Sequence, residues 1–305
     1  MEAHIMSNIY IKTASMLLAI AMGFFIKRIK LISAADARVL AKITINLTLP
    51  CMIISNMNGM TISKDLLGAL AAGFIVNFTM VMIAIAVTKG KSAEQRCIYL
   101  LSVPLFNISG FAVPMVQNFV SDRCVAAILL FNIGTAIFTY VVTPYLVGTM
   151  CFGKHEGGIL NSFKNIAKNT PAMTNCCMLV LCLLGLKLPN TFITMIKPVS
   201  DANTALAMIS IGMLLSFEGD ISRSIGVIFT RLAAAAVIGL IIYFLPLPLG
   251  EARNAMIVVL FVPMVSCAPL LALEQGYKGS GVAVVNSAYL PISVFITTMV
   301  LGLLF

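Results

Sequence analysis

The sequence has very little charge. Charged residues make up 10% of its 305 positions, against about 25% in soluble domains. Apolar residues account for 60% of the chain, and the mean hydropathy is +1.03. A water-soluble core of this size needs far less apolar surface, so the composition excludes an ordinary soluble domain and indicates a membrane protein.

The residue patterns on which many enzymes and pumps depend are absent. The only histidines are His4 and His155, both outside the apolar runs, and none of the eight cysteines forms a CxxC or a cysteine–histidine zinc spacing. The sequence has no Gly-x4-Gly-Lys-Ser/Thr phosphate loop, GxSxG elbow or HExxH helix. We therefore expect no enzymatic activity, no metal and no cofactor. An ATP-driven pump would lack its motor in this sequence, and energy would have to come from ion gradients or from a separate subunit.

Long apolar runs are abundant instead. A run of about 20 apolar residues can cross a bilayer as a helix. The first run is longer than the apolar core of a typical signal peptide, and no clear small-residue cleavage site follows it, so we expect no cleaved leader. The sequence predicts an all-α membrane protein with ten spans, at residues 8–27, 37–57, 65–88, 93–119, 121–148, 171–188, 191–217, 223–246, 251–275 and 279–304.

Prolines interrupt two of these runs. Pro104 and Pro114 lie in the fourth run, and Pro263 and Pro269 lie in the ninth. Each proline removes a helix hydrogen bond and clashes with the preceding turn. In lipid, the freed backbone groups need partners in protein or in a watered cavity. Paired breaks at matching places of two repeats indicate a transporter's binding site, although prolines that merely kink two packed helices are the alternative.

The net charge of +9 is better explained by topology than by a nucleic-acid partner. An excess of lysine and arginine marks the cytoplasmic loops of a membrane protein. With ten spans, both termini then face away from the cytoplasm, and we expect a multi-pass protein of the plasma (inner) membrane. The basic residues assigned to the cytoplasmic side are Lys27, Arg28, Lys30, Arg38, Lys89, Lys91, Arg96, Lys154, Lys164, Lys168, Arg223, Arg231 and Lys278.

A weak internal repeat appears when 157 is added to residue numbers of the first half. Asn46 then aligns with Asn203, and the two proline-broken segments align with an offset of about two residues. The repeat divides the chain into spans 1–5 in residues 1–150, a cytoplasmic basic linker in 151–170, and spans 6–10 in 171–305. Because each half has an odd number of spans, the second half must be inverted, and the two broken helices should cross near the midplane.

Several short motifs resemble those of one transporter family. Asn107-Ile-Ser-Gly-Phe-Ala-Val-Pro114 is similar to its Asn-x-x-Gly-x-x-x-Pro element, Asn46-Leu-Thr-Leu-Pro50 to its Asn-Leu-x-Leu-Pro element, and Ile211-Gly-Met-Leu-Leu215 to Ile-Gly-x-x-Leu. Ala268-Pro269, with residues 277–290, resembles its ninth and tenth spans. This is the auxin efflux carrier family, in the bile acid/auxin transporter-like superfamily. The resemblance implies ten spans, inverted repeats, crossed broken helices and carriage of organic anions.

The helix breaks are the expected substrate site. The second half of a broken helix begins with exposed N–H groups and a partial positive charge, which favour an anion. Asn46 and Asn203 have amides that can bind a carboxylate, but an interhelical hydrogen bond explains them equally well. The residues expected to bind substrate are Asn107, Ser109, Gly110, Ser266, Cys267, Asn46 and Asn203.

Asp201 and Lys42 are the charged residues of interest within the spans. An intramembrane acid is costly and therefore functional by default, so Asp201 is a candidate site for coupling to H⁺ or Na⁺. An interfacial position just after Lys197-Pro198 is the alternative. Lys42 could supply a positive charge to an anionic substrate, or its ammonium could snorkel to the interface.

The remaining polar and small residues of the spans are expected to pack helices together. For Asn132 and Asn286 we favour interhelical packing, and Gly68, Gly73, Gly134, Gly212 and Gly239 should allow close helix approach. Glu274 and Gln275 could offer oxygens to sodium, but solvation at the membrane edge explains them better.

The sequence favours a secondary carrier or facilitator of small organic anions, such as mono- or dicarboxylates and auxin-like acids, that works by alternating access. A passive channel or a sensor-like receptor on the same scaffold is the alternative. The expected partners are the lipid bilayer and the organic anion, with a homodimer left open beside a monomer.

Overall fold

The computed structural model describes residues 2–31, 33–61, 64–117, 119–153, 169–214, 222–245, 252–265, 267–277 and 279–305. These described residues form helices and connecting turns, with no strand among them, so the all-helical expectation is confirmed. Within the described part of the chain, five helices are long and apolar enough to cross a membrane: Val39–Met57, Leu66–Val87, Asp122–Phe152, Ser224–Phe244 and Gly281–Leu304. They fit a membrane-embedded protein.

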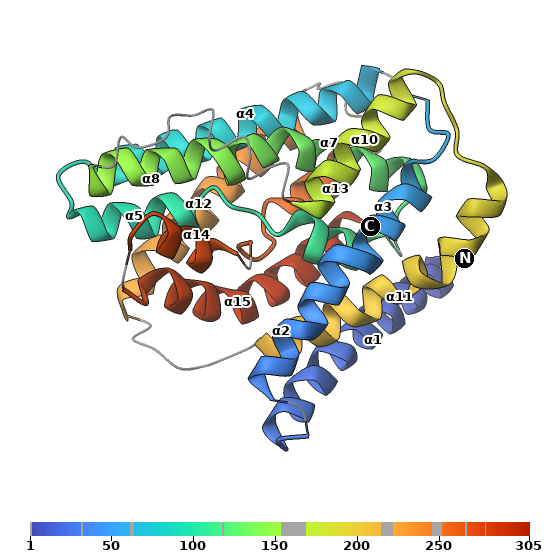
Figure 1. Cartoon of the computed structure of the whole chain (residues 1–305), viewed down its shortest axis with the longest axis horizontal. Coiled ribbons are helices and arrows are strands. Elements are labelled where there is room, and N and C mark those ends of the chain that lie inside the picture. Colours follow the sequence, from blue (N-terminus) through green and yellow to red (C-terminus); the bar gives the residue numbers. More distant parts are fainter. Residues whose placement is uncertain are drawn as a thin grey trace.

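The helices form two bundles, and each bundle takes helices from both halves of the chain. In the first bundle, α1 lies along α11, and α3 packs against α10 and α11. Figure 1 shows α1, α2 and α11 together at the lower right. The helices of this bundle are α1 (Glu2–Arg28), α2 (Ala34–Ile43), α3 (Leu49–Met57), α10 (Thr170–Leu183) and α11 (Asn190–Leu214).

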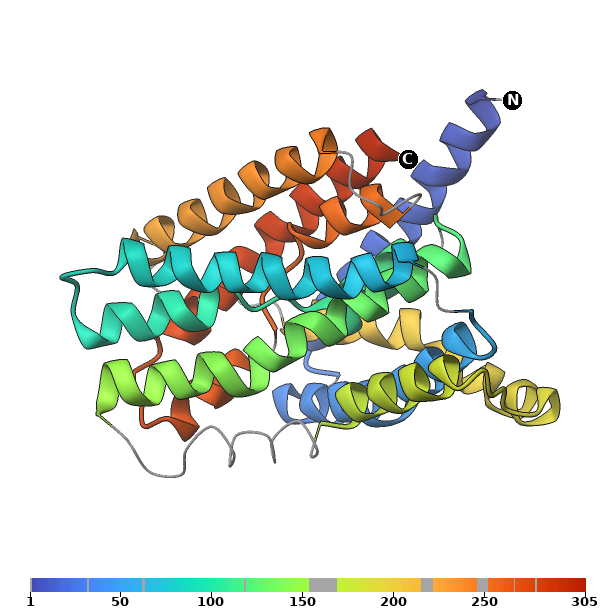
Figure 2. The same cartoon turned by 90° about the horizontal axis from the view of Figure 1, so that it is seen from above.

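The second bundle is larger and contains both broken helices. In it α4 lies along α7, α5 packs against α8, and α12 packs against α15. Figure 2 shows the same separation from above, with α12 in orange at the upper left and α10 in yellow-green at the lower right. Its helices are α4 (Lys64–Val87), α5 (Ala93–Ser102), α6 (Val113–Val116), α7 (Asp122–Ile137), α8 (Thr143–Phe152), α12 (Ser222–Phe244), α13 (Ala252–Val259), α14 (Ala268–Glu274) and α15 (Gly281–Leu304).

Glycines allow the closest helix pairs, as the sequence predicts. A Cβ added at Gly134 of α7 would lie 2.3 Å from the carbonyl oxygen of Leu70 in α4. A Cβ added at Gly212 of α11 would lie 1.9 Å from the carbonyl oxygen of Ile20 in α1. At Gly239 the same addition meets only side-chain atoms at 3.5 Å or more. The expectation that this glycine allows close helix approach is therefore wrong.

Three helices contain a wide π-helical turn, and a proline follows each turn two residues later. Proline lacks an N–H and its ring displaces the carbonyl four residues earlier, so widening the turn absorbs the mismatch. Single π turns of this kind are frequent at functional sites. The turns are η1 (Thr44–Thr48), η2 (Ile108–Ala112) and η3 (Phe138–Val142), and the prolines are Pro50, Pro114 and Pro144.

The breaks of the two broken helices contact each other. α5 ends at Ser102 and η2 begins at Ile108, while α13 ends at Val259 and α14 begins at Ala268. Between these ends, the N–H of Asn107 donates to the carbonyl oxygen of Pro263 at 2.9 Å.

Each of these helices has one break rather than the two expected. Pro114 lies in the first turn of α6, directly after η2, and Pro269 lies in the first turn of α14. Pro114 is accommodated by the widened turn of η2, which continues directly into α6, whereas Pro269 is tolerated because the N–H that it lacks would have no intrahelical partner in the first turn of α14. The breaks therefore lie around Pro104 and Pro263.

Arg231, which the sequence assigns to the cytoplasmic side, does not lie at the protein surface: it is within α12 and is 1% exposed. The sequence did not reveal this burial, because the carbonyl groups that accept from the guanidinium belong to distant segments of the chain.

Polar contacts tie the loop between α14 and α15 to the start of α5. The hydroxyl of Tyr277 donates to Oε1 of Glu94 at 3.1 Å, and the N–H of Gly281 donates to the Tyr277 oxygen at 3.2 Å. Burial, together with the hydrogen bond to Glu94, raises the pKa of Tyr277 to about 12, so this phenol stays protonated at neutral pH.

Candidate functional site

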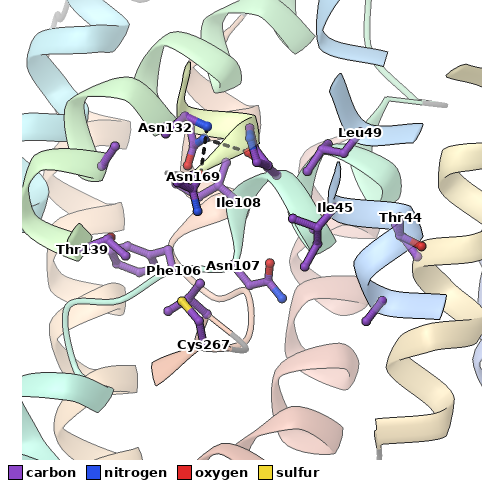
Figure 3. A pocket seen from close by; sticks show the side chains of 18 of the residues that line it. Thr44, Ile45, Leu49, Phe106, Asn107, Ile108, Asn132, Thr139, Asn169 and Cys267 are labelled. Carbon is purple, nitrogen blue, oxygen red and sulfur yellow. Dashed lines mark hydrogen bonds between the residues drawn. The ribbon is translucent and has the colours of Figure 1, made fainter. Parts of the chain in front are cut away.

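A cavity of about 260 Å³ lies between the two bundles, beside the breaks of the two broken helices. Figure 3 shows Ile45 and Leu49 on one side of it and Asn132 and Thr139 on the other. The first bundle contributes Ala41, Thr44, Ile45, Leu49, Asn169, Pro171, Ala172, Ala207, Ser210 and Ile211. The second contributes Phe106, Asn107, Ile108, Ser109, Gly110, Asn132, Ala136, Thr139, Tyr140, Val265 and Cys267.

The polar groups of this cavity are neutral. Amides and hydroxyls of Asn107, Ser109, Asn132, Asn169 and other residues face an otherwise apolar wall, and none of the described lining residues is charged. Nδ2 of Asn132 donates to Oγ of Ser109 at 2.7 Å, and this bond joins α7 to η2 (Figure 3). A few convergent polar groups in an apolar pocket are typical of a small-molecule site.

The three π turns all line the cavity. Thr44 and Ile45 come from η1, residues 108–110 from η2, and Thr139 and Tyr140 from η3. A π turn exposes backbone and rotates the side chains that follow it. The widened turns, each followed by a proline, therefore bring backbone groups of three helices to the same cavity.

The absence of a side chain at Gly110 leaves space for the side chain of Asn107. A Cβ at Gly110 would lie 2.6 Å from Oδ1 of Asn107, so the asparagine side chain rests against the bare glycine. The carbonyl oxygen of Asn107 accepts from the N–H groups of Phe111 and Ala112, at 3.2 and 3.1 Å. Asn107 therefore begins the helix after the break, with its side chain held at the start of η2.

The structure brings together four of the seven residues that the sequence predicts for substrate binding. Asn107, Ser109, Gly110 and Cys267 line the cavity. Ser266 lies outside the described residues.

The other two predicted residues, Asn46 and Asn203, make interhelical hydrogen bonds in the first bundle and do not line this cavity. Oδ1 of Asn46 accepts from Oγ1 of Thr170 at 2.7 Å, and Oδ1 of Asn203 accepts from Oγ1 of Thr48 at 2.9 Å.

The two charged candidates also lie away from this cavity. The side chain of Asp201 is 61% exposed, and its Oδ1 accepts from Nζ of Lys197 at 3.2 Å. Lys42 is exposed on α2, and its carbonyl oxygen accepts from Nδ2 of Asn46 at 3.0 Å. The coupling and charge-partner roles of Asp201 and Lys42 stay predictions.

A second cavity, of about 730 Å³, lies further toward the start of α11. Its lining includes Asp201 and Thr204, whereas the first cavity meets α11 at Ala207 and beyond. Nε2 of Gln117, just after α6, donates to Oγ1 of Thr204 and joins the two bundles at this level. Both residues line the second cavity, so the bond joins the bundles beside that cavity.

Sequence reasoning missed five polar lining residues and underrated a sixth. Asn132, which we expected to pack helices, lines the cavity together with Thr44, Thr139, Tyr140, Asn169 and Ser210. Oδ1 of Asn169 accepts from the N–H of Ala172 at 2.9 Å and caps α10. The signals were a proline after residues 138–142, as after the other two π turns, and an Asn-Thr-Pro helix start.

Comparison with known proteins adds no relative to this picture. No family model matches the chain, and no curated protein matches it. The similarity to auxin efflux carriers therefore depends on short motifs, three of which coincide with cavity-lining segments: residues 46–50, 107–114 and 211–215 each contribute at least one lining residue.

Proposed function

We propose that this protein is a secondary carrier of small organic anions that works by alternating access. The observation that carries the proposal is the cavity between two bundles beside the breaks of two broken helices. Broken helices near the centre of a membrane protein supply backbone groups for substrates and ions. The volume of about 260 Å³ is near the lower end for ligand pockets, which favours a small molecule.

The chemistry of the lining favours an anion over a cation. Asparagine side chains, hydroxyls and the N–H groups at the start of η2 can all donate hydrogen bonds to a carboxylate, and no described lining residue carries a negative charge. The apolar remainder of the wall suits the hydrocarbon part of a mono- or dicarboxylate. A cation would lack a carboxylate partner among these residues.

The division into two bundles favours a carrier over a channel. The cavity is bounded by different bundles on its two sides, and the Gln117–Thr204 bond joins the bundles on the side of the second cavity. Rocking one bundle against the other would break such a bond and open the site in that direction. A channel would instead need a continuous path past this level.

Ten spans, inverted five-span repeats and membership of the auxin efflux carrier family belong to the same proposal. The contact between the break near Pro104 and the break near Pro263 supports it, because these breaks occupy matching places in the two halves of the sequence. Two shorter helices joined by a break can together cross a bilayer that neither spans alone.

Uptake by the purified protein in liposomes tests the function. We expect saturable uptake of at least one labelled acid from a panel that includes malate, lactate and indole-3-acetate, together with counterflow when unlabelled acid is loaded inside. Counterflow is the decisive result, because a carrier returns its site with substrate bound and a channel does not. Unsaturable flux without counterflow would favour the channel, and binding without flux would favour the receptor.

The predicted topology can be tested by labelling single cysteines. In a variant without the exposed Cys177, a cysteine replacing Lys89 should be protected from a membrane-impermeant thiol reagent added outside intact cells. A cysteine replacing Asn190 should react, because ten spans place these loops on opposite sides. Lys89 and Asn190 are both exposed in the structure, so poor access within the fold would not explain a difference. Equal labelling of both would contradict the ten-span arrangement.

A further inference from the structure

Arg231 lies where the breaks of the two broken helices contact each other, and its side chain joins them. Its Nη1 donates to the carbonyl oxygens of Ser102 and Val103, both at 2.7 Å, and of Leu105 at 3.1 Å. Its Nη2 donates to the carbonyl oxygen of Val262 at 3.1 Å. The first three acceptors belong to the break after α5 and the fourth to the break after α13, so one guanidinium bridges both.

Two aromatic rings complete the enclosure of this guanidinium. Cζ of Arg231 lies 4.6 Å from the centroid of the Phe106 ring and 5.1 Å from that of Tyr289. The hydroxyl of Tyr289 donates to the carbonyl oxygen of Phe261 at 3.1 Å, which fixes this ring to the second break. Cation–π attraction strengthens when the pair is removed from water. Since Phe106 also lines the cavity, the positive charge is one ring away from the proposed substrate site.

The partners of this buried charge are those that a metal cation would use. All four acceptors are backbone carbonyl oxygens, and no carboxylate of the described residues pairs with the guanidinium. Hard cations such as Na⁺ take oxygen ligands, and unwound backbone carbonyls coordinate them in carriers with broken helices. Arginine remains protonated in proteins and is more weakly hydrated than an ammonium group, so its charge here is permanent.

We propose that Arg231 takes the place of a coupling cation at the contact between the two breaks. It occupies the carbonyl groups that an inorganic cation would need, it holds the two breaks together, and its charge attracts an anion to the neighbouring cavity. Substrate movement then needs no Na⁺ at this position. The anion-attracting role rests on the proposed carrier function, whereas the occupation of a cation site does not.

The test compares wild type with Arg231→Ala, using simple cations as probes. For purified wild-type protein, we expect the same melting temperature in sodium chloride and in choline chloride. Arg231→Ala should melt at a lower temperature, because four buried carbonyls lose their donor. Low, non-denaturing concentrations of guanidinium ion, or of Na⁺, should raise the melting temperature of this variant by refilling the site, and should leave that of wild type unchanged.

Arg96→Ala is the matched control. Arg96 also donates to backbone carbonyls, those of Met150 and Thr88 at 3.5 and 3.4 Å, but it lies half-buried at the far end of α5. Its removal should give no stabilisation by guanidinium or Na⁺. Stabilisation of wild type by Na⁺ over choline would overturn the proposal, as would an Arg231→Ala protein that responds to neither cation.

Arg231→Lys serves if the alanine variant cannot be recovered. This variant keeps a positive charge but loses the forked guanidinium that reaches both breaks. We therefore expect a lower melting temperature that still does not depend on Na⁺. A melting temperature that rises with Na⁺ would count against the proposal. These measurements need no substrate. Failure of every acid in the uptake panel would therefore contradict the carrier function and the anion-attracting role, while the melting temperatures decide the cation site separately.

Discussion

Asn107→Ala is expected to weaken binding of the transported acid by roughly 10- to 100-fold. Asn107 stands at the break after α5, lines the cavity and begins the helix that follows. Loss of one hydrogen bond to a charged group costs about 1.5–3 kcal/mol, and each 1.4 kcal/mol is about tenfold in affinity. The measurement is the concentration dependence of uptake, or of competition for it, in liposomes with the acid that wild type transports best.

Asn254→Ala is the control for this substitution. Asn254 is also half-buried and donates to a backbone carbonyl, that of Leu304 at 3.0 Å, but it does not line the cavity. It should retain wild-type affinity even if its melting temperature falls. If Asn107→Ala keeps its affinity but loses thermal stability, Asn107 stabilises the contact between the two breaks and does not bind the substrate.

Gly134→Ala should destabilise the protein by about 1–3 kcal/mol, the usual cost of adding a methyl group to a filled interface. The new Cβ would lie 2.3 Å from the carbonyl oxygen of Leu70 and 2.8 Å from the backbone nitrogen of Phe74. Both are backbone atoms of α4, so a side-chain rotation cannot relieve the clash and α4 must move away from α7. The measurement is the thermal unfolding temperature of the purified protein in detergent.

Gly302→Ala is the matched control for this change. Gly302 is also helical, in α15, and a Cβ added there meets no atom within 4 Å. Alanine is favoured over glycine in a helix by up to about 1 kcal/mol, so this variant should unfold at the same temperature as wild type or higher. Equal behaviour of the two variants would show that α4 and α7 can separate at little cost.

The helices and the breaks were largely predictable from the sequence. Long apolar runs such as residues 65–88 and 279–304 correspond closely to α4 and α15, because a run of that length has few ways to satisfy its backbone other than a helix. Pro104 and Pro263 marked the breaks for the same local reason. The prediction that Pro114 and Pro269 also break their helices was wrong, because the cost of a proline depends on its position in the helix.

Asn46 and Asn203 show why the site was harder to predict than the helices. The sequence repeat paired these asparagines and left substrate binding and an interhelical hydrogen bond equally open, and the structure gives each a partner within the first bundle. The sequence shows that an asparagine lies in a span, but it does not show whether the amide faces a cavity or a neighbouring helix. The direction in which it faces follows from the rotation of each helix, and the π turns shift that rotation part-way along three of them.

The sequence by itself determined the class of protein, its helical content and the location of the helix breaks, since these follow from hydrophobicity and from the missing N–H of proline. Only the tertiary structure decided what meets at the breaks. Asn107 and Asn132 are brought to one cavity, and Arg231 is buried in the interior. A buried guanidinium is tolerated only where several acceptors converge on it, and four carbonyl groups from two distant segments converge only after the chain has folded.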